Sequence, residues 1–141
     1  MSTESNKRLL QQVYAELAQG NSAPLLHCLA DDVRWTVSGS TAWSGCYEGK
    51  PAVLEQLLRP LGQRLAGRYR AHALRFIAEG DEVMVEARGE AVTRAGLPYN
   101  NRYCFIYRLA NGQVRELTEY GDTALVEAAL GSRPPAGPAG S

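Results

Sequence analysis

A run of alternating aromatic and polar residues is the part of this sequence best suited to bind a small molecule. Tyr99, Asn101, Tyr103, Phe105 and Tyr107 are each two residues apart, so a β-strand would place them on one face. We expect this face to form the wall of a pocket, with Asn101 and Tyr103 hydrogen-bonding the ligand. For Phe105 and Tyr107, packing in an ordinary core is the alternative.

The next predicted strand carries a carboxylate toward the same region. Glu119 stands near its end, followed by Tyr, Gly and Asp122. A carboxylate enclosed by aromatic rings has a raised pKa, which suits a general acid or base near neutral pH. The alternative is a carboxylate at the rim, paired with Arg115 or Arg102. Asp122 follows where this strand should end, so we expect it to cap a turn or form an ion pair.

Three further polar residues come from earlier predicted strands. Arg88 and Glu90 are two residues apart and therefore share a strand face. The opposite face of that strand carries the apolar residues, so a solvent-facing or dimer-facing row is the alternative for this pair. His72 shares a predicted face with Phe76, from which it could reach a cavity and act as a base. A histidine with satisfied hydrogen bonds in the core is the other possibility.

The elements that must position these residues follow from periodicity and turn signals. Asn111-Gly112 is the strongest hairpin signal, because both positions of a type I′ turn need positive φ. Pro60 must kink or end the third helix. The pattern predicts helices at 5–19, 24–30 and from 49 onward, and strands at 33–37, 70–78, 82–93, 99–109 and 113–124. This is an α+β layout: three N-terminal helices packed on a curved, mainly antiparallel sheet, with a cavity between them.

Composition narrows the class of protein. The 141 residues suit one domain, which we place at 1–130, before a Pro- and Gly-rich tail at 131–141 that we expect to be flexible. The 15 basic and 15 acidic residues balance, so nucleic acid is not an expected partner. The three cysteines form no CxxC pair, which argues against a disulfide framework and a zinc site. No signal peptide or apolar run of membrane-spanning length is seen, so we expect a cytoplasmic protein without a membrane partner.

The sequence resembles the SnoaL-like proteins of the nuclear transport factor 2-like superfamily, whose relatives include ketosteroid isomerase and limonene epoxide hydrolase. The resemblance covers roughly residues 8–126 and is carried by the segments YAELAQGN at 14–21, LADDVRW at 29–35, GKPAVL at 49–54, FIAEGDEVMVE at 76–86 and the stretch 99–122. It implies a cone-shaped α+β barrel with a hydrophobic pocket, often a homodimer through the outer sheet face. It also implies acid–base catalysis without a cofactor.

The resemblance assigns roles to individual residues. Glu119 matches the acid–base carboxylate of the cyclases and epoxide hydrolases. Arg88 resembles the arginine that links two carboxylates in the hydrolases, which would make Glu90 and Glu119 the acid and the base. Tyr14 matches the oxyanion-hole tyrosine of the isomerases, with a satisfied core tyrosine as the alternative. Trp35 is expected at the mouth of the pocket.

Two departures argue against a strict steroid isomerase. The strand at 35–37 lacks the catalytic aspartate, and no carboxylate stands near 103–104. We therefore expect a cofactor-free acid–base enzyme of the isomerase, cyclase or epoxide hydrolase type, acting on an apolar carbonyl or epoxide compound. The alternatives are a domain that only binds a small molecule, and an assembly module that dimerises through Arg102, Cys104, Ile106 and Arg108.

Overall fold

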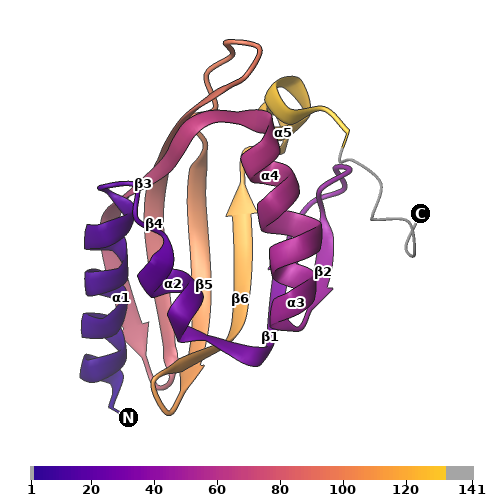
Figure 1. Cartoon of the computed structure of the whole chain (residues 1–141). Helices are drawn as coiled ribbons and strands as arrows, with labels where there is room; N and C mark the ends of the chain where they lie inside the picture. The colour runs from indigo at the N-terminus through magenta and orange to yellow at the C-terminus, as the bar shows by residue number, and fades with distance from the viewer. Residues whose placement is uncertain (1, 133–141) are drawn as a thin grey trace.

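A computed structural model describes residues 2–132 of the chain as a curved sheet partly wrapped by helices (Figure 1). The predicted tail at 131–141 lies outside the described residues from 133 onward. In chain order the elements are α1 (Thr3–Leu17), α2 (Ala23–Cys28), β1 (Leu29–Val37), β2 (Gly45–Glu48), α3 (Lys50–Ala52), the π-helix η1 (Val53–Leu58), α4 (Arg59–Arg64), β3 (Leu65–Glu79), β4 (Glu82–Thr93), β5 (Arg102–Ala110), β6 (Gln113–Gly121) and α5 (Thr123–Leu130).

The six strands form one mixed sheet in the order β2-β1-β6-β5-β4-β3. Strands β3 to β6 are an antiparallel meander, as the short connections predict. The Asn111-Gly112 turn joins β5 to β6 with both residues at positive φ, which confirms the predicted hairpin. Strand β1 runs parallel to β6, pairing Trp35 with Leu117 and Val37 with Glu119. Residues from near the two ends of the domain therefore meet in the middle of the sheet.

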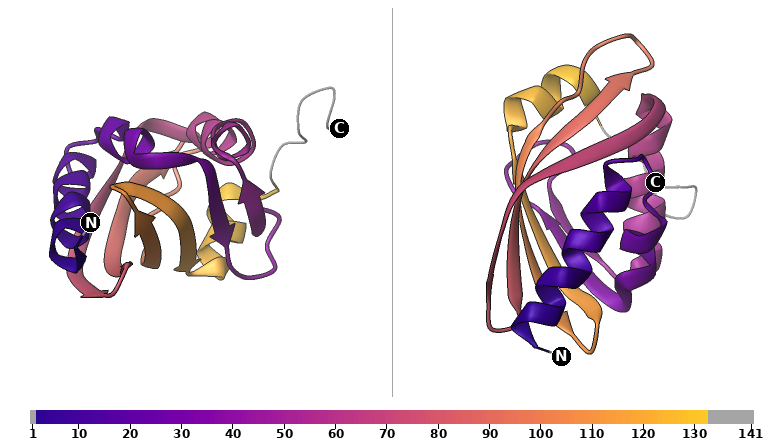
Figure 2. Two further views of the ribbon diagram at one scale, coloured as in Figure 1. Left: turned by 90° about the horizontal axis from the view of Figure 1, so that it is seen from below. Right: turned by 90° about the vertical axis from the view of Figure 1, so that its left-hand side faces the viewer.

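Helices α1 and α2 and the helical segment 50–64 lie over one face of the curved sheet, and α5 lies at one end of it (Figure 2). Helix α1 begins at a capping box in which the Ser2 and Ser5 side chains each accept a hydrogen bond from the other residue's backbone. It buries Leu10, Val13 and Leu17 against the sheet. This agrees with the apolar stripe that predicted the helix. The architecture is the expected α+β cone.

The third predicted helix is irregular in its middle. Its backbone is π-helical from Val53 to Leu58, and the Arg59 amide donates to the carbonyl of Leu54, five residues back. Pro60 follows directly in α4, where it has no N–H to donate to the preceding turn. The helix therefore continues past Pro60 to Arg64, and its irregular part is the π-helical segment before the proline. The interrupted helix lies over the sheet opposite α1 (Figure 1).

Two elements differ from the sequence expectation. Residues 45–48 form strand β2, which the sequence pattern did not predict, and this strand pairs with β1. The last predicted strand ends at Gly121, and the chain continues as helix α5. Asp122 caps this helix by accepting a hydrogen bond from the Leu125 amide, so its predicted capping role is confirmed. Within residues 2–132 no helix has the length and hydropathy needed to cross a membrane.

Candidate active site

The space between helices and sheet is a cavity of about 530 Å³. This size falls within the usual range for small-molecule sites. Much of its lining is leucine, supplied by α1, α2, the η1–α4 helix and α5. The aromatic residues in its wall are Tyr14, Trp35, Trp43, Tyr69, Tyr99, Tyr103, Phe105 and Tyr107, and one interior carboxylate, Glu119, joins them.

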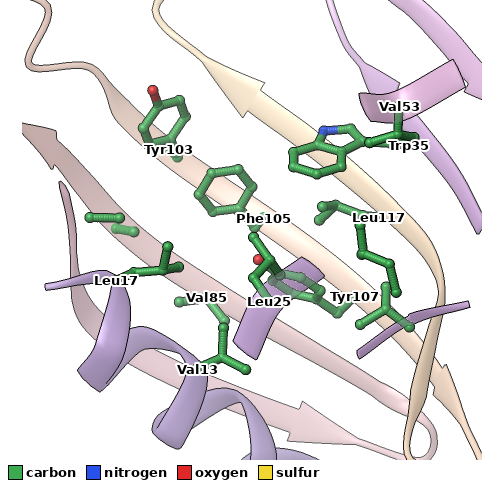
Figure 3. Close-up of a cluster of buried hydrophobic side chains, with 14 of the residues drawn as sticks. Val13, Leu17, Leu25, Trp35, Val53, Val85, Tyr103, Phe105, Tyr107 and Leu117 are labelled. Atoms are coloured by element: carbon green, nitrogen blue, oxygen red, sulfur yellow. The ribbon is translucent and has the colours of Figure 1, made fainter. Parts of the chain in front are cut away.

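Strand β5 supplies one side of this wall. Tyr103, Phe105 and Tyr107 follow one another along the same face of the strand, and Trp35 lies across from them (Figure 3). The rings of Tyr103 and Phe105 stack with centroids 4.7 Å apart. Tyr99 and Trp35 also line the cavity. Phe105 and Tyr107 are buried and also line the cavity, so each belongs both to the core and to the pocket wall.

Glu119 projects into the cavity from β6. It pairs across the sheet with Phe105 on β5 and with Val37 on β1. The indole Nε1–H of Trp35 donates a hydrogen bond to Glu119 Oε1 over 3.1 Å. Burial raises the pKa of this carboxyl from 4.5 to about 7, although the hydrogen bond from Trp35 acts in the opposite direction. At neutral pH both protonation states are therefore populated.

No arginine neutralises Glu119 among the described residues. Arg115 forms an ion pair with Asp32 at 2.9 Å, and Arg102 is exposed. The other carboxylate that lines the cavity is Glu55 on η1, which is paired with Arg59 at 2.9 Å and is largely exposed. Within the part of the chain described, Glu119 is thus the one interior carboxylate of the cavity, and its Oε2 accepts no hydrogen bond from these residues.

A pair of buried phenols forms one polar point in the cavity. The hydroxyl oxygens of Tyr14 and Tyr107 are 2.6 Å apart. Burial raises the pKa of both phenols, so both stay protonated at neutral pH. One proton lies between the two oxygens, which leaves the other hydroxyl proton free to bind a ligand. Tyr14 is therefore both buried and part of the cavity wall.

A second phenol group lies toward the other end of β5. The hydroxyls of Tyr69, Tyr99 and Tyr103 lie close enough to influence one another's pKa. Burial is the main reason that the pKa of all three phenols is raised. Close packing holds the group together, because a Cβ on Gly89 would lie 3.0 Å from the Tyr69 hydroxyl and 3.1 Å from the Tyr103 ring. A larger residue at position 89 would require the two rings to shift by a few tenths of an ångström.

Asn101 has a structural role that differs from the expectation. It is 1% exposed and does not line the cavity. Its Oδ1 accepts hydrogen bonds from the amides of Arg102 and Asp122, and its Nδ2 donates to the Tyr99 hydroxyl and to the Asp122 carbonyl. The protein itself therefore supplies the partners that we expected from a ligand. Asn101 fixes the position of Tyr99 against the end of β6.

The predicted group of Arg88, Glu90 and Glu119 is not brought together. Arg88 and Glu90 are exposed, on the face of β4 opposite to the cavity, and neither lines it. This is the solvent-facing row that the apolar pattern of the strand allowed. His72 lies on the same outer face, where its Nε2 is 2.8 Å from Glu90 Oε1.

A strand irregularity explains the error for His72. The pairing of β3 with β4 shifts by one residue between Ala73 and Arg75, which is a β-bulge. Alternation therefore breaks at Leu74, which is 55% exposed, and Phe76 returns to the inner face. His72 and Phe76 share a face only in an unbroken strand. No glycine or proline stands at residues 73–75 to indicate this bulge in the sequence.

Tyr69 is the main cavity residue that the sequence interpretation missed. It stood at the predicted start of a strand, whereas β3 begins at Leu65 and bulges before Arg70. Gly67, with φ of +77°, lies in this bulge and was the available signal. Within residues 2–132, no group of three or more His, Cys, Asp or Glu side chains is placed to hold a metal ion.

Comparisons with known proteins agree with this geometry. Residues 10–117 match the model of the SnoaL-like domain. An uncharacterized protein from Mycobacterium tuberculosis is 25% identical over 131 residues, which cover 90% of this chain and 97% of that protein. An NTF2-like protein from Burkholderia pseudomallei superposes with a TM-score of 0.76 at 22% identity, covering 92% of this chain and 98% of that one. A proposed SnoaL-like polyketide cyclase from Jannaschia sp. gives 0.73 at 18% identity, covering 94% and 95%.

Proposed function

The chain belongs to the SnoaL-like domain family, and we propose that it is an isomerase- or cyclase-type enzyme that transfers a proton within an apolar carbonyl compound. One observation carries the proposal: an interior carboxylate with a pKa of about 7 faces a leucine- and aromatic-lined cavity. General bases work best when their pKa is close to the operating pH. The lining favours a substrate made mostly of carbon rings or chains.

The proposed reaction begins with proton abstraction. The ionised Glu119 takes a proton from the carbon next to the substrate carbonyl, and the electron pair moves to the carbonyl oxygen. A protonated phenol stabilises the resulting enolate by donating a hydrogen bond. The two candidates are the free hydroxyl proton of the Tyr14–Tyr107 pair and the Tyr69–Tyr103–Tyr99 group. In an unsaturated ketone the enolate is conjugated with the C=C bond, and Glu119 ends the reaction by returning the proton to the far carbon of that system. In a cyclase the enolate carbon instead attacks a second carbonyl and closes a ring, and the alkoxide formed there takes the proton back from Glu119.

Epoxide hydrolysis has less support. The resemblance required Arg88 and Glu90 beside Glu119, and both side chains are exposed on the outer face of β4. A single interior carboxylate can remove and return one proton without a partner acid. Hydrolysis of an epoxide requires an acid that protonates the epoxide oxygen and, at the same time, a base that deprotonates the attacking water. The site therefore favours proton transfer over hydrolysis.

Hydrogen–deuterium exchange tests the proposal without knowledge of the substrate. A panel of cyclic ketones and 1,3-diketones is incubated with the protein in D₂O, and deuterium next to the carbonyl is followed by mass spectrometry. We expect the wild type to accelerate exchange for at least one compound and Glu119→Gln to lose about 10²-fold or more of that rate. Glu55→Gln, at the rim, is the matched control and keeps the rate. Equal rates for wild type and Glu119→Gln would remove the proposal.

A protein that only binds its ligand is the second candidate. It is favoured by the absence of any other interior carboxylate in the described part of the cavity. Against it, Glu119 is not neutralised by Arg115 or Arg102, which was the arrangement expected of a binding domain. A ligand that binds tightly while no ketone exchanges its protons would support this candidate. A homodimer through the outer sheet face remains a proposal that light scattering tests directly.

A further inference from the structure

A second hollow lies directly beside the cavity. It has a volume of about 410 Å³ and lies between the loop after α1, the start of α2 and the start of β3. Ser22, Leu26 and Tyr69 line both spaces. These three side chains lie between the two spaces, so a ligand that fits past them would reach from the apolar cavity into the hollow.

A bulge in β3 produces this arrangement. Ala66 pairs with Val92 and Arg70 pairs with Glu90, so four steps along β3 correspond to two along β4. The residues between leave the ladder, and bulges of this kind redirect side chains. The Tyr69 ring turns inward to the cavity, whereas Arg68 is exposed at the hollow.

The Arg68 side chain is held by a glycine across the hollow. A Cβ on Gly20 would lie 3.2 Å from Arg68 Cδ and 3.3 Å from its Cβ. The arginine stem therefore packs directly on the Gly20 backbone, in the loop that ends α1. Gly20 has φ of +82°, a conformation that other residues rarely adopt. This packing keeps the guanidinium beside the hollow.

The charge of Arg68 has no partner in residues 2–132, where neither an ion pair nor a hydrogen bond involves its side chain. The carboxylate closest along the chain to the hollow is that of Glu16, and it accepts a hydrogen bond from Asn21 Nδ2 at 3.2 Å. The other lining side chains of the hollow are neutral. A guanidinium with five donors and no partner is suited to bind an oxyanion.

We propose that the hollow binds an oxyanion at one end of the ligand, through Arg68, while the apolar body of the ligand fills the cavity. The ligand class is then an apolar ring compound with a carboxylate or a phosphate ester at one end. This inference rests on the proposed function for the position of the apolar body, but it concerns binding alone. Arg68 orients the compound by its anionic end, and the reacting carbonyl is presented to Glu119.

Displacement of a neutral fluorescent probe tests the inference. N-phenyl-1-naphthylamine is bound to the protein and displaced by 2-naphthoate, 2-naphthyl phosphate or neutral 2-acetylnaphthalene. In the wild type we expect the two anions to displace the probe at lower concentrations than the ketone. Arg68→Ala should raise the concentration needed for the anions by about fivefold and leave the ketone within about twofold. The anion that loses more affinity identifies the carboxylate or the phosphate as the preferred end.

The matched control is Arg8→Ala, which removes one positive charge from α1 away from both spaces. Arg8→Ala should leave the displacing concentration of every competitor unchanged. Thermal melting checks that each variant is folded. The inference would be overturned if Arg68→Ala lowered the affinity for the anions and the ketone equally. It would also be overturned if Arg8→Ala lowered the affinity for the anions as much as Arg68→Ala does. These outcomes differ from failure of the proposed function, because displacement does not depend on Glu119 chemistry and is repeated in Glu119→Gln.

Discussion

Trp35 and Glu119 are joined by a hydrogen bond from the indole Nε1–H to the carboxylate Oε1, over 3.1 Å, although 84 positions separate them in the chain. They come from the parallel strands β1 and β6. The bond occupies one carboxylate oxygen and stabilises the ionised form. Burial favours the neutral form, and the balance of the two effects places the pKa at about 7.

Removing the indole donor should shift this balance. In Trp35→Phe the carboxylate loses its hydrogen bond, so we expect the pKa of Glu119 to rise above about 7. The measurement is a titration of the Glu119 carboxyl carbon by NMR, with Glu119→Gln used to assign the signal. Trp43→Phe is the control, since the Trp43 indole donates to the Gly131 carbonyl and not to Glu119. A fall in the pKa of Glu119 in Trp35→Phe would contradict the account.

The raised pKa also predicts how stability depends on pH. Below about 4.5 the carboxyl is neutral in the folded and unfolded chain, so burial carries no ionisation penalty. Between about 4.5 and 7 the unfolded chain ionises first, and this group's contribution to stability is lost as pH rises. Glu119→Gln cannot ionise. Relative to wild type it should therefore gain on the order of 3 kcal/mol in unfolding free energy between pH 4 and pH 8.

Urea unfolding at the two pH values measures this difference. Glu55→Gln serves as the control, because its exposed carboxyl is paired with Arg59 at the rim. If the difference between Glu119→Gln and wild type were the same at pH 4 and pH 8, the buried carboxyl would not titrate as described.

The Tyr14–Tyr107 pair should show strong coupling. Tyr14→Phe or Tyr107→Phe alone leaves one buried hydroxyl without its partner, which costs about 1–3 kcal/mol of unfolding free energy. The double variant removes both hydroxyls, so we expect it to be less destabilised than the sum of the single variants. A double-mutant cycle by urea unfolding gives the coupling energy. Additive effects would mean that the 2.6 Å contact contributes nothing to stability.

Gly89 should be intolerant of even one added methyl group. Gly89→Ala places a Cβ 3.0 Å from the Tyr69 hydroxyl, and the rigid Tyr103 ring prevents relaxation on the other side. We expect a loss of about 1–3 kcal/mol and weaker binding of cavity ligands. Gly62→Ala in α4 is the control: no atom lies within 4 Å of its added Cβ, so it should stabilise by about 0.5–1 kcal/mol. A tolerated Gly89→Ala would show that the phenol group is not tightly packed.

Much of the fold followed from local signals. The Asn111-Gly112 turn, the apolar stripe of α1 and the alternation of β5 each depend on residues close in sequence, and each was placed correctly. The parallel pairing of β1 with β6 depends on distant residues and has no local signature. Helix α5 was missed because the last strand was predicted to run to residue 124, whereas β6 ends at Gly121.

The site was predictable where one face of a strand carried the signal. Tyr103 and Phe105 follow the alternation of β5, whereas Glu119 was assigned from its place near the end of the last predicted strand and from the family resemblance. His72 and Tyr69 could not, because both lie beside bulges of β3 that change which way a side chain points. Asn101 was expected to bind the ligand because the sequence showed no other partners for its amide. Its four hydrogen bonds run to backbone groups and a phenol that meet only in the folded chain.

The parallel contact of β1 with β6 also bears on how the chain folds. Strand β1 begins at Leu29, but its central neighbour starts only at Gln113, so closing the sheet requires ordering most of the chain between them. During synthesis β1 has an unpaired edge until the final hairpin emerges, and such edges promote aggregation. The acidic Asp31-Asp32 pair at the start of β1 adds charge that opposes edge-to-edge association. The carboxylate and the indole that define the site therefore meet only when the last strand joins the sheet.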